Sequence, residues 1–436
     1  MIQEVTEKVK KREARVAVIG LGYVGLPLAV EIATAGFETI GLDTSEEKVS
    51  SIQQGKNYIM DVDSQVLQAL VQKKKISATS DYSILQSCDY IVVCVPTPLS
   101  KGKEPDISYV VSAFSKIKLY LKRGQVIILE STTYPGTTEE VVLPMLQESG
   151  MKVGQDFYLA FSPERIDPGN KKFGLRNTPK VIGGVTPSCT EMSSMLYETF
   201  VEKIFPVFSS RTAEMVKILE NTFRAINIGL ANEVAIMCNH LNINVWEVIE
   251  AAATKPFGFM PFYPGPGLGG HCIPVDPHYL VWKLKSVDYK PRFIQLADEI
   301  NSSMPELVVN KIVDALNGRQ KAINGSKILV LGVSYKKDID DYRESPSLDV
   351  IKILQKKRAV VHYHDPHVPI LAFDGIKLQS SPLTDASTAQ YDCVVLLTDH
   401  SSFDIKNIVR HSQLFVDTRN AARNLASDYL EKVFRL

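Results

Sequence analysis

The run Gly20-Leu21-Gly22-Tyr23-Val24-Gly25 constrains the fold of this chain more than any other feature. It follows residues 15–19, whose apolar and β-branched side chains predict a buried parallel strand. Residues 26–35 predict an apolar helix that ends at Gly36, and residues 37–42 predict a second strand. Asp43 ends that strand, 23 positions after Gly20. Because strand, glycines, helix, strand and acid occur in this order, the sequence predicts a dinucleotide-binding βαβ unit.

Each glycine of this run is expected to have a separate structural role. Gly20 permits a tight turn, Gly22 lets a pyrophosphate approach the backbone, and Gly25 lets helix and strand pack closely. The amides at the start of the helix are donors for the pyrophosphate. An acid at Asp43 accepts hydrogen bonds from ribose hydroxyls and favours NAD over NADP. The alternative, a glycine-rich turn without a ligand, is disfavoured by this context.

Composition excludes several classes of function. The chain has 436 residues, which suggests two or three domains, and 45% hydrophobic with 22% charged residues is ordinary for a globular protein. The formal net charge is zero, so we expect no nucleic-acid or membrane partner. Residues 1–15 lack the apolar segment of a signal peptide, and no apolar run reaches a membrane-spanning length. We therefore expect a cytoplasmic protein.

The six cysteines are scattered, without Cys-x-x-Cys pairs or metal-ligand spacing. This pattern favours free thiols in a reducing compartment, and we expect no metal site.

Three further apolar runs, residues 90–95, 125–129 and 157–160, predict strands. Each is followed by polar residues, which include Thr97, Thr132 and Glu164. Because parallel strands present their carboxyl ends at one edge of a sheet, these residues are predicted to line one crevice. The alternative is that each is an ordinary transition from strand to loop.

After residue 207 the apolar period changes, and residues 211–240 and 246–253 predict helices. Lys217, Asn221 and Arg224 share one face of the longer helix. A charged face is usually solvated, although asparagine is a poor helix former and favours a site. Both interpretations remain open at this point. Apolar helices between two sheet domains also predict a surface for dimerisation.

Residues 265–277 form a loop in which four glycines precede Cys272, and Asp276 follows four residues later. Glycine allows close approach to a ligand, and proline fixes the loop shape. A thiol with a nearby carboxylate is a candidate nucleophile. The alternative is a surface loop with an incidental cysteine.

The last third repeats the βαβ pattern. Strands are expected within residues 326–333, 360–364, 391–397 and 414–416, with a helix over 347–354. The turn after the first of them has one glycine, Gly332, followed by Lys336 and Lys337, so we expect phosphate to be held by basic side chains. Arg343 is a further basic candidate. The alternative is a structural domain with basic surface residues.

The predicted fold is therefore α/β, with two Rossmann-like doubly wound domains joined by a central long-helix region. The expected division is an NAD-binding domain over 1–210, a central region with the cysteine loop over 211–315, and a second Rossmann-like domain over 316–436.

At this point the sequence resembles the UDP-glucose/GDP-mannose dehydrogenase family. The resemblance covers most of the chain and rests on several motifs together: Gly20 to Pro27, Ser131-Thr132, Pro163-Glu164, Glu214-Met215-Val216-Lys217 with Asn221, Gly269-Gly270-His271-Cys272 with Pro274 and Asp276, and Tyr335-Lys336-Lys337 with Arg343. In UDP-glucose enzymes an aromatic residue usually follows the glutamate. Arg165 stands there instead and resembles the N-acetylhexosamine branch.

The resemblance implies that two NAD+ oxidise a sugar C6 alcohol to a carboxylate, with the UDP-sugar as substrate and a homodimer or higher homo-oligomer as the assembly. It also implies a role in nucleotide-sugar supply for polysaccharides such as O-antigen. UDP-N-acetylglucosamine is the expected substrate. UDP-N-acetylmannosamine, UDP-N-acetylgalactosamine and UDP-glucose remain alternatives, as does a non-catalytic nucleotide-sugar binder.

The resemblance also implies roles for individual residues. Cys272 would be the nucleophile, with its thiolate favoured by Lys217. Lys217 and Asn221 would stabilise oxyanions, and Thr132 and Asp276 would position water. Glu164 would act as general base in thioester hydrolysis. Which of Lys217, Asp276 and Glu164 removes the first proton stays open. The implied cofactor-binding residues are Gly20, Gly22, Tyr23, Val24, Gly25, Asp43, Lys48, Thr97, Thr132 and Arg343. The implied substrate-binding residues are Glu164, Arg165, Ile166, Lys217, Asn221, Arg224, Tyr263, Gly267, Lys336 and Arg419.

Overall fold

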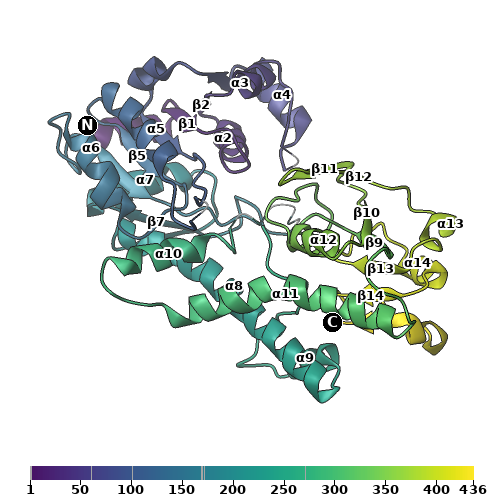
Figure 1. Ribbon diagram of the computed structural model, residues 1–436. Coiled ribbons are helices and arrows are strands. Elements are labelled where there is room, and N and C mark those ends of the chain that lie inside the picture. Colours follow the sequence, from purple (N-terminus) through teal and green to yellow (C-terminus); the bar gives the residue numbers. More distant parts are fainter. Residues whose placement is uncertain (1, 60, 101, 168–169, 171, 271) are drawn as a thin grey trace. The chain divides into compact units, whose positions relative to one another are not determined.

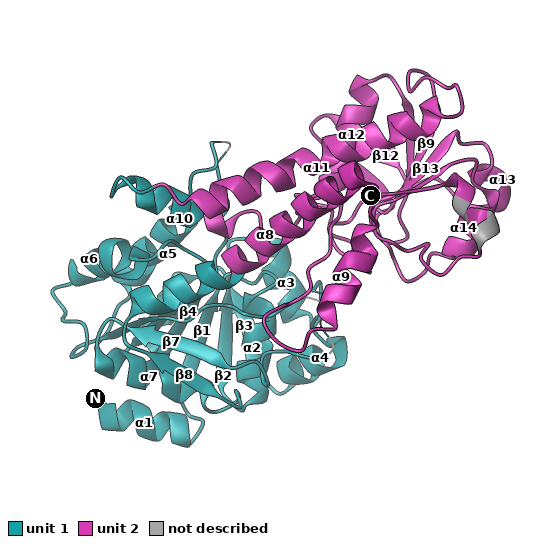
Figure 2. Ribbon diagram, turned by 90° about the horizontal axis from the view of Figure 1, so that it is seen from below, with its two compact units in different colours: residues 1–220, 278–289 teal, residues 221–277, 290–436 magenta. Residues whose placement is uncertain are grey.

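The computed structural model describes residues 2–59, 61–100, 102–167, 170, 172–270 and 272–436 (Figure 1). His271 of the cysteine loop, together with 168 and 169 of the segment after Glu164, lies outside these residues. The chain forms two units, Met1–Glu220 with His278–Tyr289, and Asn221–Pro277 with Lys290–Leu436 (Figure 2). The predicted division at residues 210 and 315 differs from this grouping and stays a prediction.

The first unit is built on an eight-stranded sheet in the order β3-β2-β1-β4-β5-β6-β7-β8. The pairs from β3 to β6 are parallel, β6 and β7 are antiparallel, and β7 and β8 are parallel. Its strands are β1 Arg15–Ile19, β2 Glu38–Leu42, β3 Ile76–Thr79, β4 Tyr90–Val93, β5 Val126–Leu129, β6 Tyr158–Phe161, β7 Lys180–Gly184 and β8 Ile204–Val207. The chain order reverses between β1 and β4, which in such sheets marks the ligand crevice.

Helices cover both faces of this sheet, and each face has its own buried apolar cluster. They are α1 Ile2–Lys10, α2 Gly25–Thr34, α3 Glu46–Gln53, α4 Ser64–Gln72, α5 Ser108–Leu119, α6 Leu143–Gln147 and α7 Pro187–Tyr197, with the short turns η1 Tyr82–Ser87 and η2 Thr138–Val142. The central strands β1, β4 and β5 are buried on both sides, which is why they appear in the sequence as continuous apolar runs.

The second unit contains a five-stranded parallel sheet in the order β10-β9-β13-β14-β15, and a separate hairpin of β11 and β12. Its strands are β9 Lys327–Leu331, β10 Val360–His364, β11 Ile370–Phe373, β12 Ile376–Gln379, β13 Cys393–Leu396, β14 Phe415–Asp417 and β15 Val433–Arg435. The remaining helices of the chain are α8 Ser210–Leu241, α9 Val245–Ala253, α10 Asp276–Lys285, α11 Arg292–Asn317, α12 Pro346–Lys356, α13 Asp385–Thr388 and α14 Ile405–His411, with η3 Ser427–Lys432. Helix α8 begins in the first unit, and most of α10 belongs to it.

These elements confirm the predicted α/β class with two Rossmann-like sheets and long central helices. The strand over residues 15–19 has the predicted limits, and the helix predicted over 211–240 is α8. The sequence analysis did not identify the hairpin of β11 and β12 or the long helix α11, which contains Pro305.

Candidate functional site

The glycine turn after β1 has the geometry that the sequence predicts. Gly20 has φ +91°, and a Cβ there would lie 2.5 Å from the carbonyl oxygen of Cys94. A Cβ on Gly25 would lie 1.8 Å from the oxygen of Gly20, so helix α2 and strand β1 are closer than any side chain allows. A Cβ on Gly22 would meet nothing within 4 Å. Gly22 therefore faces open space of the kind that a pyrophosphate needs.

Asp43 holds this turn to the end of β2. One carboxylate oxygen accepts hydrogen bonds from the amide of Leu21, at 2.8 Å, and from Nζ of Lys48, at 3.2 Å. The other accepts from the amide of Ser45 at 2.9 Å. Asp43 is buried, with 7% of its surface exposed. Asp43 and Lys48, both predicted to bind the cofactor, thus lie together beside the glycine turn. Tyr23 is half exposed, and Val24 precedes helix α2.

Thr97 and Thr132 follow β4 and β5 at the same edge of the sheet. The carbonyl of Thr97 accepts a hydrogen bond of 2.6 Å from the hydroxyl of Tyr279, on α10. Thr132 is half-buried and leads into the turn at residues 134–136. The predicted crevice residues of the first unit therefore gather where the strand order reverses.

The segment after β6 contacts the part of α8 that belongs to the first unit. Lys217, buried with 7% exposure, donates from Nζ to the carbonyl oxygen of Glu164. The carboxylate of Glu164 accepts from the amide of Ile166, and all of these residues were predicted to bind substrate. Arg165 forms a two-point ion pair with Glu220, in which Nη2 and Oε1 are 2.6 Å apart, and Nη1 donates to the carbonyl of Pro179.

In the second unit a hydrogen-bonded chain links α8 to the cysteine loop. Asn221 donates from Nδ2 to Oδ2 of Asp276 and accepts at Oδ1 from Arg224. Asn221 and Asp276 are buried, with 1% and 3% exposure. The amide of Asp276 donates to the carbonyl of Cys272 at 2.8 Å, which closes a helical turn directly after the thiol. Cys272 is exposed, whereas the other five cysteines are buried.

The face of α8 that carries Lys217 and Asn221 is thus buried, and the solvated alternative does not hold for these two residues. Leu219 and Phe223 on the same helix are exposed by 57% and 46%. Helix α8 therefore buries Lys217 and Asn221 together with apolar residues such as Ile218, while Leu219 and Phe223 face outward.

The glycine loop packs closely within the second unit. A Cβ on Gly270, which has φ +97°, would lie 3.0 Å from the ring of Tyr335. A Cβ on Gly267 would lie 2.9 Å from Pro346, and one on Gly265 would lie 2.8 Å from Nη1 of Arg419. The loop therefore lies against Arg419, a predicted substrate residue, and against Tyr335, which directly precedes the predicted Lys336.

Arg419 donates from Nε to the carbonyl of Leu397 at 2.7 Å. Burial lowers the pKa of this guanidinium, although Asp399 and Asp417 act in the opposite direction. Tyr263 stacks on Trp246 of α9, with ring centroids 6.0 Å apart and an interplanar angle of 15°. Lys336 is half-buried. Arg343 is exposed and forms a two-point ion pair with Asp341, with Nη2 and Oδ2 2.8 Å apart.

The second unit repeats the Asp43 arrangement with a different partner. Asp365 follows β10 and accepts from the amides of Val333, at 2.7 Å, and His367, at 2.9 Å, as Asp43 does from Leu21 and Ser45. Nε2 of His400 lies 3.0 Å from Oδ2 of Asp365, the oxygen that also accepts from Val333, just as Lys48 binds the oxygen of Asp43 that accepts from Leu21. Burial opposes ionisation, but hydrogen bonds from His400, Val333 and His367 lower the pKa of Asp365.

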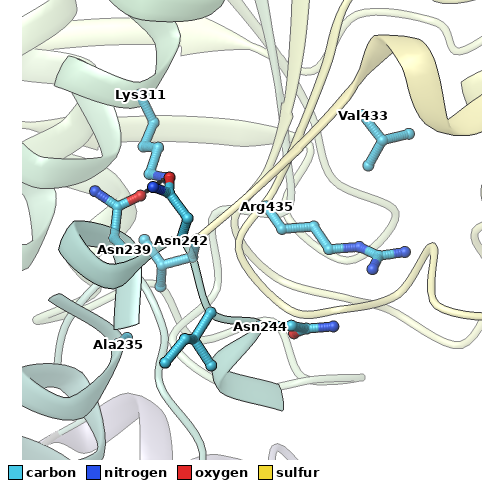
Figure 3. A pocket seen from close by; sticks show the side chains of 9 residues that line it. Ala235, Asn239, Asn242, Asn244, Lys311, Val433 and Arg435 are labelled. Carbon is cyan, nitrogen blue, oxygen red and sulfur yellow. Dashed lines mark hydrogen bonds between the residues drawn. The ribbon is translucent and has the colours of Figure 1, made fainter. Parts of the chain in front are cut away.

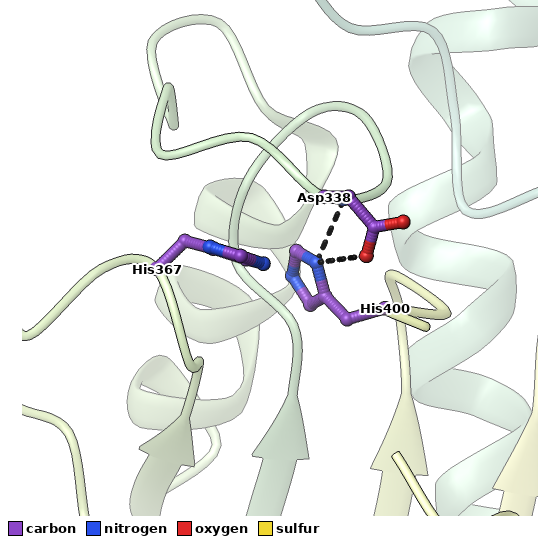
Figure 4. A group of neighbouring side chains, drawn as sticks. All are labelled: Asp338, His367 and His400. Carbon is purple, nitrogen blue, oxygen red and sulfur yellow. Dashed lines mark hydrogen bonds and ion pairs between the residues drawn. The ribbon is translucent and has the colours of Figure 1, made fainter. Parts of the chain in front are cut away.

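His400 belongs to a group with Asp338 and His367 whose potential ligand atoms lie within 4.8 Å of one another (Figure 4). The amide of Asp338 donates to Nδ1 of His400 at 3.0 Å, and Nε2 faces Asp365. Both ring nitrogens of His400 are thus engaged by protein groups, so this arrangement is a hydrogen-bonded network and not a ligand set.

A separate cavity in the second unit has a volume of 390 Å³ (Figure 3). It is lined by Ala235, Asn239, Asn242, Ile243, Asn244, Lys311, Val433, Arg435 and Leu436. None of the predicted site residues lines it.

Residues with structural importance for the site also include Glu214, to which the sequence analysis assigned no role. It is fully buried and binds the turn after Thr132. The one feature of the sequence that could have indicated a role for Glu214 is its position three residues before Lys217, within the motif that resembles the dehydrogenase family.

The mostly parallel sheet, the glycine turn and the acid after the second strand define a dinucleotide-binding protein of the doubly wound α/β class. The chain belongs to the UDP-glucose/GDP-mannose dehydrogenase family: residues 14–201 match its NAD binding domain, 211–303 its central domain and 329–424 its UDP binding domain. It is therefore an NAD-dependent nucleotide-sugar dehydrogenase.

The chain is 37% identical over 395 residues to UDP-N-acetyl-D-glucosamine 6-dehydrogenase of Pseudomonas aeruginosa, which covers 90% of this chain and 92% of that protein. It is 35% identical to UDP-N-acetyl-D-mannosamine dehydrogenase of Methanococcus vannielii, with 94% of each chain covered. Among solved structures, a UDP-D-ManNAc dehydrogenase from Pyrococcus horikoshii aligns with a TM-score of 0.88 at 33% identity, covering 97% of this chain and 98% of that one. Within the described residues, no helix is long and apolar enough to cross a membrane.

Proposed function

We propose that this enzyme oxidises C6 of UDP-N-acetyl-D-glucosamine from the alcohol to the carboxylate. The observation that carries the proposal is the chain of contacts from Arg224 through Asn221 to Asp276, which fixes the turn that follows the exposed thiol of Cys272. A buried amide and carboxylate beside a nucleophile suit a covalent reaction at a carbonyl carbon. A protein that only binds a nucleotide sugar has no need of such a nucleophile.

The proposed reaction consumes one water and two NAD+ for each sugar and yields the carboxylate, two NADH and three protons. C6 of the alcohol loses one hydride and the thiohemiacetal loses a second, and bound NAD+ would supply the acceptor for each. The thiolate of Cys272 adds to the aldehyde carbon to form that thiohemiacetal, and loss of its hydride gives a thioester. Water then cleaves the C–S bond and regenerates the thiolate. Capture on sulfur keeps the half-oxidised sugar bound between the two oxidations.

The residues of this chain have separate parts in the proposal. Lys217 and Asn221 stabilise the negative charge that develops on the C6 oxygen, and Thr132 and Asp276 position the water. Glu164 accepts the proton of that water. The turn at Gly22 and the carboxylate of Asp43 hold the cofactor, and Arg419, Lys336 and Tyr263 bind the UDP-sugar. Arg343 contributes to cofactor binding and Gly267 to the sugar pocket.

The choice of sugar rests on two observations. Relatives from Pseudomonas aeruginosa and Salmonella typhi, both named UDP-N-acetyl-D-glucosamine 6-dehydrogenase, are 37% and 34% identical over 90% of this chain. Arg165 occupies the position after Glu164 and is held by Glu220. UDP-N-acetylmannosamine is the second candidate, because relatives that bear that name are 35% identical. UDP-N-acetylgalactosamine and UDP-glucose are the further candidates.

A panel of these four UDP-sugars tests the proposal. NADH formed per sugar consumed is counted by absorbance, and the product is identified by mass spectrometry. We expect two NADH per sugar and the highest kcat/KM for UDP-N-acetylglucosamine. One NADH per sugar would refute the second oxidation. A higher kcat/KM for another sugar would make that sugar the substrate. If none of the four yields NADH, a protein that only binds nucleotide sugars would be favoured.

The assembly we propose is a homodimer or higher homo-oligomer in the cytoplasm. Large apolar side chains of α8 in the second unit are exposed, with Leu230 at 54%, Met237 at 47% and Leu241 at 67%. Exposed apolar side chains that recur along one face of a helix are typical of a subunit interface. Light scattering after gel filtration measures the mass, and Leu230→Glu is expected to shift it towards the 48.5 kDa monomer. A wild-type protein that is monomeric at micromolar concentration would refute this assembly.

A further inference from the structure

Glu214 is a buried carboxylate in α8, and its side chain is fully engaged with another segment of the first unit. Oε2 accepts a hydrogen bond of 2.5 Å from the amide of Gly136. Oε1 accepts from the amide of Thr138, at 2.9 Å, and from the hydroxyl of Thr138, at 2.7 Å. Glu214, Thr137 and Thr138 all have 0% exposure. Three donors therefore converge on one carboxylate that has no contact with solvent.

The turn that supplies these donors has a fixed shape. Gly136 has φ +103°, a backbone conformation that residues with a side chain rarely adopt, so other residues fit poorly there. The hydroxyl of Thr137 donates to the carbonyl of Tyr134 at 2.7 Å and closes the turn from inside. The turn begins two residues after Thr132, so the position of the turn constrains that of Thr132.

Glu214 precedes Lys217 by three residues, which places both on neighbouring turns of α8. Lys217 in turn donates to the carbonyl of Glu164. Two contacts of one helix thus hold the segments that carry Thr132 and Glu164.

A carboxylate is a costly group to place here. Burial raises the pKa of Glu214 to about 7, although the three hydrogen bonds from Thr138 and Gly136 lower it, and the charge of Glu139 raises it further. Tyr134 is the other titratable neighbour. All three partners of Glu214 are donors, so only the ionised carboxylate accepts from each of them. A glutamine would place its NH2 group against an N–H or an O–H.

We propose that Glu214 is a positioning residue, which holds Thr132 in register with Lys217 by binding the turn at Gly136 and Thr138. This inference rests on the proposed function for its effect on turnover. It has a second consequence that needs no sugar, because Thr132 is also a predicted cofactor contact. Displacement of Thr132 should weaken NAD+ binding as well as slow the reaction.

The test compares Glu214→Gln with Glu139→Gln in the full-length protein. Glu139 is a matched control because it joins the same two segments at the surface, through Ser210 at 2.8 Å and Arg211 at 2.8 Å. We measure kcat and KM for both substrates, and the Kd for NAD+ by calorimetry. We expect Glu214→Gln to lower kcat roughly 10- to 100-fold, the scale of a small misplacement of reacting groups. The KM for the UDP-sugar should change by less than about 2-fold, and Kd for NAD+ should rise about 3-fold. Glu139→Gln should leave all of these within about 2-fold of the wild type.

The pH dependence gives a separate readout. The wild type should lose kcat as pH falls through about 7, where Glu214 gains a proton. Glu139→Gln should keep this acid limb but show it at a lower pH, because the charge of Glu139 raises the pKa of Glu214. Glu214→Gln should be slow at every pH and lack this acid limb.

A milder pair of variants covers the case in which Glu214→Gln does not fold. Thr138→Val removes one of the three donors, and Thr138→Ser keeps it. We expect Thr138→Val to lower kcat and weaken NAD+ binding, as Glu214→Gln does. Thr138→Ser should keep both kcat and NAD+ affinity close to the wild type. Unchanged kcat and unchanged NAD+ affinity in a folded Glu214→Gln, or in Thr138→Val, would overturn the inference. If the wild type oxidises no UDP-sugar, the proposed function fails, and the NAD+ affinities of the same variants still decide the inference.

Discussion

Asn221 and Asp276 are 55 residues apart in the chain, and Nδ2 of the asparagine donates a hydrogen bond to Oδ2 of the aspartate. Arg224 occupies the other side of the same amide, so Asn221 can present its oxygen and its nitrogen in only one way. This contact fixes the start of α10 and with it the turn that follows Cys272.

Asn221→Asp is expected to lower kcat by about 10²- to 10³-fold, because it removes a donor and places a second carboxylate beside Asp276. Steady-state kinetics with the preferred UDP-sugar measures the effect. Asn227→Ala is the control, since Asn227 lies on the same helix and binds only the carbonyl of Phe223 among the interactions described for it. Near wild-type turnover in Asn221→Asp would remove Asn221 from the proposed site.

Cys272 is exposed and the other five cysteines are buried, so a limiting amount of iodoacetamide is expected to alkylate Cys272 first. Peptide mass spectrometry locates the label, and loss of NADH formation should follow its extent. Saturating UDP-sugar should slow the labelling. Cys272→Ser should lose net turnover of the alcohol to the carboxylate. Full two-step oxidation by Cys272→Ser would exclude a covalent role for the sulfur.

Asp43→Ala is expected to raise the KM for NAD+ by roughly 10-fold or more, because a charged acceptor beside the glycine turn is lost. The wild-type carboxylate also binds the amides of Leu21 and Ser45, so some loss of stability should accompany the effect. Glu38→Gln, which removes an exposed ion pair with Arg15 at the start of the same strand, is the control. An unchanged KM for NAD+ in Asp43→Ala would show that the ribose assignment is wrong.

Arg165→Met is expected to lower kcat/KM for UDP-N-acetylglucosamine more than for UDP-glucose, since we propose that Arg165 contributes to the choice of sugar. The ratio of the two kcat/KM values is the measurement. Glu220→Gln loosens the ion pair that orients Arg165 and should shift the ratio in the same direction by a smaller factor. A ratio unaffected by either change would place sugar selection elsewhere.

Glu214 makes stability depend on pH in a defined direction. Its pKa is raised from 4.5 to about 7 in the folded protein, so folding favours the protonated form. This contribution is fully present below pH 4.5 and is lost as pH rises through about 7. The free energy of unfolding of the wild type, relative to Glu214→Gln, should therefore fall across this window, by about 3 kcal/mol at most. Denaturant titrations at several pH values measure it, and a constant difference would show that Glu214 does not titrate there.

Local sequence was sufficient for much of the fold. Residues 15–25 predicted the first strand and its turn because an apolar run and three glycines act on the backbone within a few residues. The strand over residues 360–364 was predicted, but the contacts of Asp365 after it with Val333 and His400 were not, because they depend on how three strands align.

The periodicity of the sequence did not predict which residues of α8 are buried. Its charged face was open to two interpretations, and the apolar residues Leu219 and Phe223 proved exposed while Lys217 and Asn221 are buried. Periodicity shows which residues share a face, but it does not show which face is covered.

The sequence by itself determined the two βαβ patterns, the glycine turn, the acid after the second strand and the motifs that resemble one family of dehydrogenases. These features are local, because backbone conformation and side-chain period are set over a few residues. Only the tertiary structure decided that Glu214 binds Gly136 and Thr138, that Glu220 holds Arg165, and that Asn221 meets Asp276. Those partners are 55 to 78 residues apart in the chain, and they meet because helix α8 packs where buried polar groups must find donors and acceptors.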